Sequence, residues 1–383
     1  MLYKLKDIFD LQMGKTPSRN NIEYWNTNDY KWVSISDLTK TDKYIYDTKE
    51  YLSKKAVNES GIKIIPANTV IMSFKLSIGK TAITAEDMYS NEAIMAFHDK
   101  HIVEIIPEYI FYLFKYKNWD DGSNKAVMGK TLNKAILSEV EIDICSIEEQ
   151  RKIVNVLDKI MNLISARKKE LSYLDTFTKA RFVEMFGDMT LARNDWEKLL
   201  LCDVCDVRDG THDSPKYFTE GYPLITSKNV SGGKIDFSDC NLICEEDYNK
   251  INQRSKVDVG DILMPMIGTV GKPVIVDSQK KFAIKNVALI KFRENSAVVN
   301  SFIKVLLESD YFDREVINKV RGGTQKFISL GDIRKLNICL PPIKLQNQFA
   351  AFVNEIDKSK SAVKKALDET QLLFDSLMQE YFG

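Results

Sequence analysis

Apolar residues recur at alternating steps of four and three along two long stretches of the chain, residues 146–187 and 342–383. This 3.5-residue spacing is typical of a coiled-coil seam. Pro341-Pro342 mark the start of the second stretch, and Gly187 ends the first. The pattern predicts two long helices whose seam residues are Ile153, Leu157, Ile160, Ile164, Leu171, Leu174, Phe349, Val353, Ile356, Val363, Leu367 and Phe374.

The regions that precede the two stretches have shorter apolar runs bounded by polar and turn residues. Short runs of this kind are typical of strands, and longer ones of helices. The predicted strands are 31–38, 64–74, 80–85, 92–97, 223–230, 260–266, 272–277 and 286–292, and the predicted helices are 109–119 and 302–317. Each region is therefore expected to be an α+β unit.

The chain repeats itself. The two helical stretches align without a gap at an offset of 196 residues, which places Gln150 on Gln346. The regions before them match more weakly, with residues 5–14 aligned on 201–210. A repeat of this length indicates two copies of one structural unit in a single chain.

The repeat has a geometric consequence. Two similar halves in one chain commonly pack around a pseudo-two-fold axis, which would make the long helices antiparallel. Each helix would span about 60 Å at 1.5 Å per residue. The expected order is a first globular head (1–145), a first spacer helix (146–187), a second head (188–341) and a second spacer helix (342–383). The two heads would sit at opposite ends of the antiparallel coiled coil.

Composition limits the classes of function. Lys and Arg number 54, as do Asp and Glu, so the chain has no net charge, and each head is also close to neutral. This excludes binding to nucleic acid by bulk charge alone. No apolar run reaches the ~18 residues of a membrane span, and no signal peptide is recognisable, so no membrane partner is expected. The six cysteines then indicate reduced thiols in a cytoplasmic protein.

The sequence contains no convincing catalytic or metal site. Gly-Lys-Thr occurs three times, but none of the three has the glycine that a phosphate-binding loop needs five residues earlier. These triplets fit loops that approach a DNA phosphate, or plain solvated turns. Cys202 and Cys205 have a zinc-like spacing, but Cys205 aligns with Phe9, which favours a small buried apolar residue. We therefore expect no metal.

Several segments together resemble one family, the specificity (S) subunits of type I restriction–modification systems. They are the repeated head openings, the helix starts Ile147-Glu148-Glu149-Gln150 and Ile343-Lys344-Leu345-Gln346, the endings Glu-Met-Phe-Gly and Glu-Tyr-Phe-Gly, and Leu340-Pro341-Pro342-Ile343 before the second helix. The resemblance covers essentially the whole chain. It departs at Cys145-Ser146, where the second copy has Pro341-Pro342.

The resemblance implies two target recognition domains that read a bipartite, asymmetric DNA target with a fixed gap. It implies that two methyltransferase (M) subunits dock on the helices and that restriction (R) subunits join the complex. S-adenosylmethionine, ATP and Mg would be used by those partners, and this chain would bind no cofactor and catalyse nothing itself. Two alternatives are a coiled-coil scaffold that does not bind DNA and a stand-alone DNA-modifying enzyme.

Candidate DNA contacts are Lys, Arg and small polar residues in glycine-containing or turn-like loops, because these side chains suit base edges and phosphates. Arg321 and Gln325 are the strongest candidates for reading bases, since Gly322-Gly323 let the backbone approach closely. The full set is Lys15, Thr16, Ser18, Arg19, Lys75, Ser77, Lys80, Lys130, Thr131, His212, Ser227, Lys228, Asn229, Thr269, Lys272, Arg321, Thr324, Gln325 and Lys326.

Overall fold

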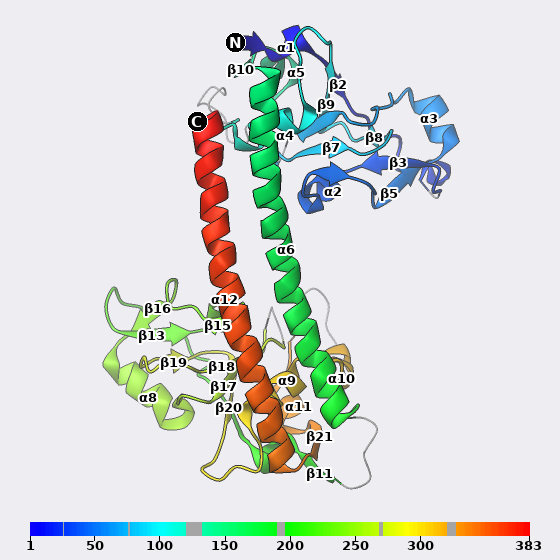
Figure 1. Cartoon of the computed structure of the whole chain (residues 1–383). Coiled ribbons are helices and arrows are strands. Elements are labelled where there is room, and N and C mark those ends of the chain that lie inside the picture. Colours follow the sequence, from blue (N-terminus) through cyan, green and yellow to red (C-terminus); the bar gives the residue numbers. More distant parts are fainter. Residues whose placement is uncertain (26, 76, 120–131, 190–195, 268–270, 320–326) are drawn as a thin grey trace. The chain divides into compact units, whose positions relative to one another are not determined.

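The structure is a computed structural model that describes the whole chain except residues 26, 76, 120–131, 190–195, 268–270 and 320–326 (Figure 1). The chain forms two compact units. Unit 1 comprises residues 1–166 and 366–383, and unit 2 comprises residues 167–365. Both boundaries lie inside the long helices α6 (Ile147–Phe186) and α12 (Ile343–Phe382), so each unit includes a part of each helix.

The core of unit 1 is a five-stranded sheet. Its strands in spatial order are β2 (Phe9–Met13), β9 (Ile94–Asp99), β6 (Val70–Ser73), β7 (Thr81–Thr84) and β4 (Tyr44–Ile45). Side chains alternate between its faces, as the two-residue period of a strand requires. Val70 and Met72 pack in one cluster with residues of α4 (Pro107–Tyr116), whereas Ile71 belongs to a separate cluster on the other face.

Unit 1 also has a smaller, three-stranded sheet, in which β3 lies between β5 and β8. The remaining elements of unit 1 are β1 (Leu2–Lys4), α1 (Leu5–Ile8), the 3₁₀ turn η1 (Ile22–Tyr24), β3 (Tyr30–Val33), α2 (Ile35–Lys40), β5 (Glu50–Leu52), α3 (Lys54–Ser60), β8 (Tyr89–Ser90), α5 (Lys134–Ser138) and β10 (Glu141–Asp143). The strand predicted at 31–38 is wrong in its second half. Ser34 and Asp37 form a reciprocal capping box that starts α2, with the Ser34 amide 2.9 Å from Asp37 Oδ2.

Unit 2 repeats this arrangement. Its larger sheet has the order β12-β20-β17-β18 and its smaller sheet the order β16-β13-β19. The elements are β11 (Glu197–Leu200), α7 (Leu201–Val204), β12 (Asp206–Asp209), β13 (Tyr222–Ile225), η2 (Ser227–Asn229), β14 (Val230–Ser231), β15 (Lys234–Ile235), β16 (Asn241–Ile243), α8 (Glu245–Ser255), β17 (Ile262–Pro265), β18 (Val274–Ile275), β19 (Ala283–Ile284), β20 (Val287–Lys291), α9 (Asn300–Leu307), α10 (Asp310–Glu315), η3 (Ile317–Lys319), α11 (Leu330–Arg334) and β21 (Asn337–Leu340). In each smaller sheet the middle strand has one antiparallel and one parallel neighbour.

The helix predicted at 302–317 is two helices in the structure, α9 and α10. Ser309 separates them, because its side-chain oxygen accepts a hydrogen bond from the Phe312 amide and so caps a new helix. Mixed helix and sheet in both units agrees with the α+β class expected from the sequence.

Most of the predicted seam residues of the two long helices pack in the cores of the two units. In unit 1, Ile153, Leu157, Ile160 and Ile164 of α6 belong to the same core cluster as Phe374 of α12. The seam residues Leu171, Leu174, Val363 and Leu367 are half-buried, whereas Ile356 is buried.

In unit 2 the two helices run antiparallel. The rings of Phe177 and Phe352 lie 5.3 Å apart, and those of Phe182 and Phe349 lie 5.5 Å apart, so the residue numbers rise along α6 as they fall along α12. Phe349 and Val353 are buried there.

A buried glutamine anchors the start of each long helix. Gln150 donates to the carbonyls of Glu104 (2.9 Å) and Cys145 (3.0 Å) and accepts from the Ile106 amide (2.9 Å). Gln346 makes the same three bonds in unit 2, and neither side chain is exposed. The glutamine therefore ties the helix start to the segment before α4 or α9.

Candidate nucleic-acid interface

Equivalent loops follow β2 and β12, and a glycine opens each. A Cβ on Gly14 would lie 2.2 Å from the Asn91 carbonyl oxygen, and one on Gly210 would lie 2.2 Å from that of Ile284. Both glycines therefore permit two segments of the protein itself to approach. The amide of Lys15 donates to the Ser90 carbonyl (2.8 Å), so this N–H is already paired within the protein.

The rest of the first loop is tied to its surroundings. Lys15 Nζ donates to the Ser60 carbonyl, and the Thr16 hydroxyl donates to Glu92. Ser18 is exposed, and its carbonyl accepts a hydrogen bond from the indole of Trp25 (3.0 Å). The loop is held in one shape, with Lys15 and Ser18 at the surface.

Arg19 has structural partners on both sides. Its guanidinium lies 3.7 Å from the centroid of the Trp25 ring and forms a two-point ion pair with Glu50, one contact of which measures 3.1 Å. The Arg19 side chain is 48% exposed. A base contact would need Arg19 to leave Glu50, so this arrangement favours a role in holding the loop.

The second candidate loop of unit 1 follows β6. Lys80 and Ser77 are exposed, and Lys75 is half-buried with its Nζ 5.2 Å from the Phe74 ring centroid. The Ser73 hydroxyl donates to the Ser77 carbonyl, and the Lys80 amide donates to the Ser73 hydroxyl (3.0 Å). These bonds present the side chains of Ser77 and Lys80 outward.

His212 in unit 2 bridges two oxygen atoms. Its Nδ1 lies 2.8 Å from Asn286 Oδ1, and its Nε2 lies 2.8 Å from Asp209 Oδ2. Hydrogen bonding to Asn286 and then to Asp209 raises the pKa of His212, because the protonated ring can donate from both nitrogens. Thr16 with Glu92 makes the corresponding tie in unit 1. The two loops are thus closed by different chemistry.

The three candidates in η2, which are Ser227, Lys228 and Asn229, differ in exposure and in hydrogen-bond partners. Asn229 is 2% exposed: its Oδ1 accepts from the Thr226 amide (3.0 Å), and its Nδ2 donates to the Asp239 carbonyl (2.8 Å). Asn229 is therefore a structural residue, and its assignment as a DNA contact is wrong. Lys228 is exposed and paired with Asp239, and the Ser227 hydroxyl donates to the Asn286 carbonyl (3.3 Å).

Lys272 is exposed after Gly271, whose φ of +78° is the left-handed conformation that favours glycine. Other candidate contacts lie outside the described residues. These are Lys130, Thr131, Thr269, Arg321, Thr324, Gln325 and Lys326.

The cysteines are all free thiols. Cys205 is buried, and burial raises its pKa to about 12, so it is an apolar core residue with an unreactive thiol. Across the part of the chain that the structure describes, no three His, Cys, Asp or Glu side chains gather in a way that could hold a metal ion.

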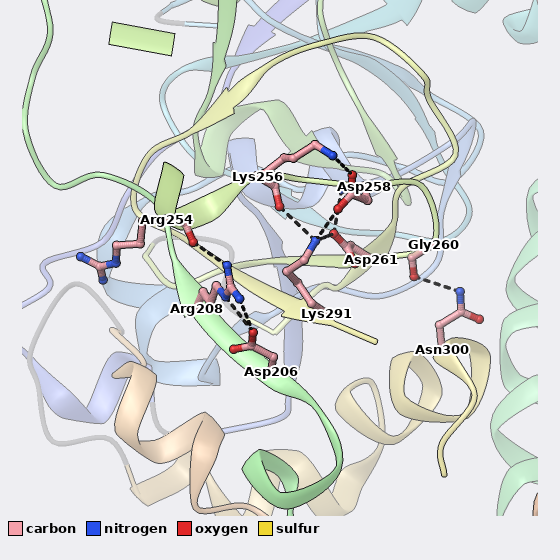
Figure 2. Close-up of polar contacts among 9 residues, drawn as sticks. All are labelled: Asp206, Arg208, Arg254, Lys256, Asp258, Gly260, Asp261, Lys291 and Asn300. Carbon is pink, nitrogen blue, oxygen red and sulfur yellow. Dashed lines mark hydrogen bonds and ion pairs between the residues drawn. The ribbon is translucent and has the colours of Figure 1, made fainter. Parts of the chain in front are cut away.

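A network of ion pairs supports the loop of unit 2 and was not foreseen from the sequence (Figure 2). Arg208 donates from Nε to Asp206 (2.8 Å) and from Nη1 to the Arg254 carbonyl (2.8 Å). The equivalent residue in unit 1, Gln12, makes a similar tie to the carbonyl of Ile64 (3.0 Å). The repeat offset relates Gln12 to Arg208 in the sequence. It does not indicate which backbone carbonyl either side chain bonds, because that carbonyl lies far away in sequence.

The second part of the network centres on Lys291. Its Nζ contacts Asp258 (2.9 Å), Asp261 (2.5 Å) and the Lys256 carbonyl (3.0 Å) (Figure 2). Hydrogen bonds from Lys256 and Lys291 lower the pKa of Asp258, whereas burial raises the pKa of Asp261 despite the same lysine. This cluster fixes the turn between α8 and β17.

Comparison with known proteins agrees with the repeat. The family model described as "Type I restriction modification DNA specificity domain" matches residues 1–173 and 193–370. The type I restriction enzyme MjaIX specificity subunit of Methanocaldococcus jannaschii is 28% identical over 385 residues, covering 92% of this chain and 85% of that protein. The EcoKI specificity subunit of Escherichia coli K12 is 21% identical, covering 88% and 79%.

Solved structures share the fold. The crystal structure of a type I restriction-modification S subunit from M. genitalium has a TM-score of 0.55 at 15% identity, covering 100% of this chain and 96% of that one. A chain from a study of the assembly and conformational transition of the type I R-M system has a TM-score of 0.59 at 17% identity, covering 100% and 97%. Among the described residues no helix is long and apolar enough to cross a membrane. With both copies of its repeat matched by one family model, this chain belongs to the type I restriction modification DNA specificity domain family.

Proposed function

We propose that the chain is the subunit that selects the DNA sequence in a type I restriction–modification complex, with each unit reading one half of a bipartite, asymmetric target. The observation that carries this proposal is the repeat of one fold with divergent loops. Thr16 and Glu92 close the loop of unit 1, whereas His212, Asn286 and Asp209 close that of unit 2. Different loop chemistry on one scaffold suits two different half-sites.

The proposal assigns the long helices two further roles. As an antiparallel coiled coil they would hold the two half-site readers at a fixed distance. Their outer surfaces would also dock two M subunits, because both helices carry large apolar side chains that are at least half exposed. These are Leu163, Tyr173, Val183, Leu372 and Leu373. R subunits would complete the nuclease.

The chemistry is assigned to the partners. M subunits would use S-adenosylmethionine, and R subunits would use ATP and Mg. The near-neutral charge of each head supports shared DNA binding, since partner subunits would then supply part of the contact with phosphates.

The test is to compare the chain alone with its complex. Purified alone, the chain should neither methylate nor cut DNA, whereas the complex with M should methylate one bipartite sequence in the host genome. Native mass spectrometry should show two M subunits per chain at saturation. Methyl transfer by the isolated chain, or a single M per chain, would contradict the assignment.

A prediction for the half-sites concerns Arg321. Replacing Arg321 by Ala should weaken binding of the complex by ~1–3 kcal/mol if the side chain makes a two-point base contact. The loss should relax one half-site and leave the other unchanged, measured by methylation of a library randomised in each half-site. An equal loss on random DNA would reassign Arg321 to a phosphate, and no loss would remove it from the interface.

A further inference from the structure

Two basic side chains of unit 2 converge on one buried carboxylate. Asp209 ends β12, and its side chain is 10% exposed. Arg254 pairs with its Oδ1, and His212 lies 2.8 Å from its Oδ2. The Arg254 and His212 side chains are 68% and 63% exposed. The carboxylate is therefore covered by the two side chains, whose outer surfaces face solvent.

The backbone that carries Arg254 is fixed. Arg254 lies in the last turn of α8, and its carbonyl accepts the hydrogen bond from Arg208, which Asp206 holds in turn. Figure 2 shows the Arg254 side chain extending away from the Arg208–Asp206 pair. With one guanidinium nitrogen held by Asp209, the other N–H donors of Arg254 are directed by a rigid support.

The loop beside Arg254 is equally fixed. The Thr211 amide donates to the Ile284 carbonyl (3.0 Å), and the Asn286 amide donates to the Thr211 carbonyl (3.2 Å). Lys285 Nζ donates to the Ser214 hydroxyl (2.5 Å). Arg254, His212 and Lys285 thus lie on segments that are bonded to one another.

The charged groups of this cluster are few. The basic groups are Arg254, Lys285 and, when protonated, His212. The acidic groups are Asp209, which is buried between its two partners, and the exposed Asp213. The cluster is locally basic when His212 is protonated, on a chain that has no net charge.

We propose that Arg254 binds a DNA phosphate, with Asp209 as its positioning residue and His212 supplying a second positive charge. This rests on the proposed function, because it assumes that unit 2 lies on DNA. Guanidinium is suited to phosphate because it offers several N–H donors in one plane. His212 acts through its charge, since both its ring nitrogens already have partners in the protein.

The carboxylate that holds Arg254 in unit 2 is not repeated at the equivalent position of unit 1. Met13 occupies the position of Asp209 at the repeat offset, and it is 48% exposed. A thioether offers no charge to hold an arginine. The described position equivalent to Asp209 in unit 1 therefore lacks the carboxylate, and substitutions in the cluster should leave the half-site read by unit 1 unchanged.

The main test is the salt dependence of DNA binding by the complex with M. Duplexes that carry the sequence methylated by the complex, and duplexes of random sequence, are titrated between 50 and 300 mM salt. Arg254→Gln should weaken both by the same factor, about five- to tenfold at the low-salt end, and reduce the salt slope by about 0.9, the value for one lost phosphate contact. The matched control is Arg314→Gln on α10 of the same unit. It removes the same charge from the ion pair of Arg314 with Asp188 and should leave the slope unchanged.

Three further variants test positioning and charge, and thermal melting controls for folding. Asp209→Asn removes a negative charge, so charge alone predicts tighter binding, whereas loss of positioning predicts weaker binding. His212→Asn should abolish a pH dependence that the wild type shows, with affinity falling as the pH rises through the raised pKa of His212 and the ring loses its charge. Thermal melting of each variant identifies those that fail to fold, and Arg254→Lys, which keeps the charge, should recover part of the affinity.

Two outcomes would overturn the phosphate contact: an unchanged salt slope in Arg254→Gln, and a loss confined to one base pair of the target. Tighter binding by a folded Asp209→Asn variant would overturn the positioning role of Asp209. Failure of the wild-type complex to bind any duplex is a different result, because it would reject the proposed function itself.

Discussion

Replacing Gln346 by Leu should lower the free energy of unfolding of unit 2 by about 2–4 kcal/mol, because three buried backbone groups lose their partner at once. Gln346 donates to the Ala297 carbonyl (3.0 Å) and the Pro341 carbonyl (2.8 Å) and accepts from the Val299 amide (2.9 Å). Leucine fills a similar volume but has no polar atoms, so the cost comes from the unpaired groups.

The measurement is urea unfolding of the full chain followed by circular dichroism. Gln348→Leu is the matched control, since Gln348 is exposed on the same helix and lies in the same unit. It should change the free energy of unfolding by no more than about 0.5 kcal/mol. Gln150→Leu should destabilise unit 1 by a similar amount to Gln346→Leu in unit 2. Equal midpoints for Gln346→Leu and Gln348→Leu would show that Gln346 does not anchor the helix.

This glutamine pair illustrates what can and cannot be predicted from a repeat in the sequence. The alignment singles out Gln150 and Gln346 as matching positions at the start of the helices. It does not show that both are buried, because a glutamine at a helix start is ordinarily a solvent-exposed residue. The reason lies in the segment before α4 or α9, whose backbone needs a partner at that place.

The long helices were the most predictable part of the fold. Apolar positions 3.5 residues apart over some forty residues leave little alternative, and the observed helices Ile147–Phe186 and Ile343–Phe382 lie within one residue of the predicted bounds. Short elements were less predictable. The strand predicted at 31–38 ends at Val33, because the capping box of Ser34 and Asp37 starts a helix inside an apolar run.

The candidate site was predictable in part. The His212 loop could be found because the repeat aligns it with residues 14–16. The ion pair of Asp209 with Arg254 could not, because 45 residues separate its partners and the contact exists only in the folded unit. Asn229 shows the opposite error. A polar side chain in a loop suggests a DNA contact, but its amide instead closes the turn of η2.

The second large prediction concerns the length of the helices. One heptad inserted after Ala166 and one after Lys365 would lengthen α6 and α12 where the two units divide. Seven residues are two steps of the 3.5-residue spacing, so the insertion keeps each seam on its own face of the helix. The contacts between the two seams are preserved only if both helices receive the insertion. Each helix gains about 10.5 Å at 1.5 Å per residue.

If the helices set the distance between the half-sites, the gap in the target should grow by at most about three base pairs, at 3.4 Å per base pair. Three base pairs also rotate one half-site by about 100° around the DNA axis, given ~10.5 base pairs per turn. The DNA must then twist or bend to present both half-sites, at a cost of ~1–6 kcal/mol. We therefore expect a longer gap, weaker binding and unchanged half-site sequences.

The readout is methylation by the complex of a duplex library in which the two half-sites are held constant and the gap varies. An insertion in α6 alone serves as the control, because it displaces the seam of α6 by one heptad relative to that of α12 and should reduce assembly itself. The double insertion restores the register, so a complex that assembles and keeps full affinity for the original gap would mean that the helices do not position the half-site readers. The spacing would then have to come from the partner subunits, whose contacts with DNA the insertion leaves in place.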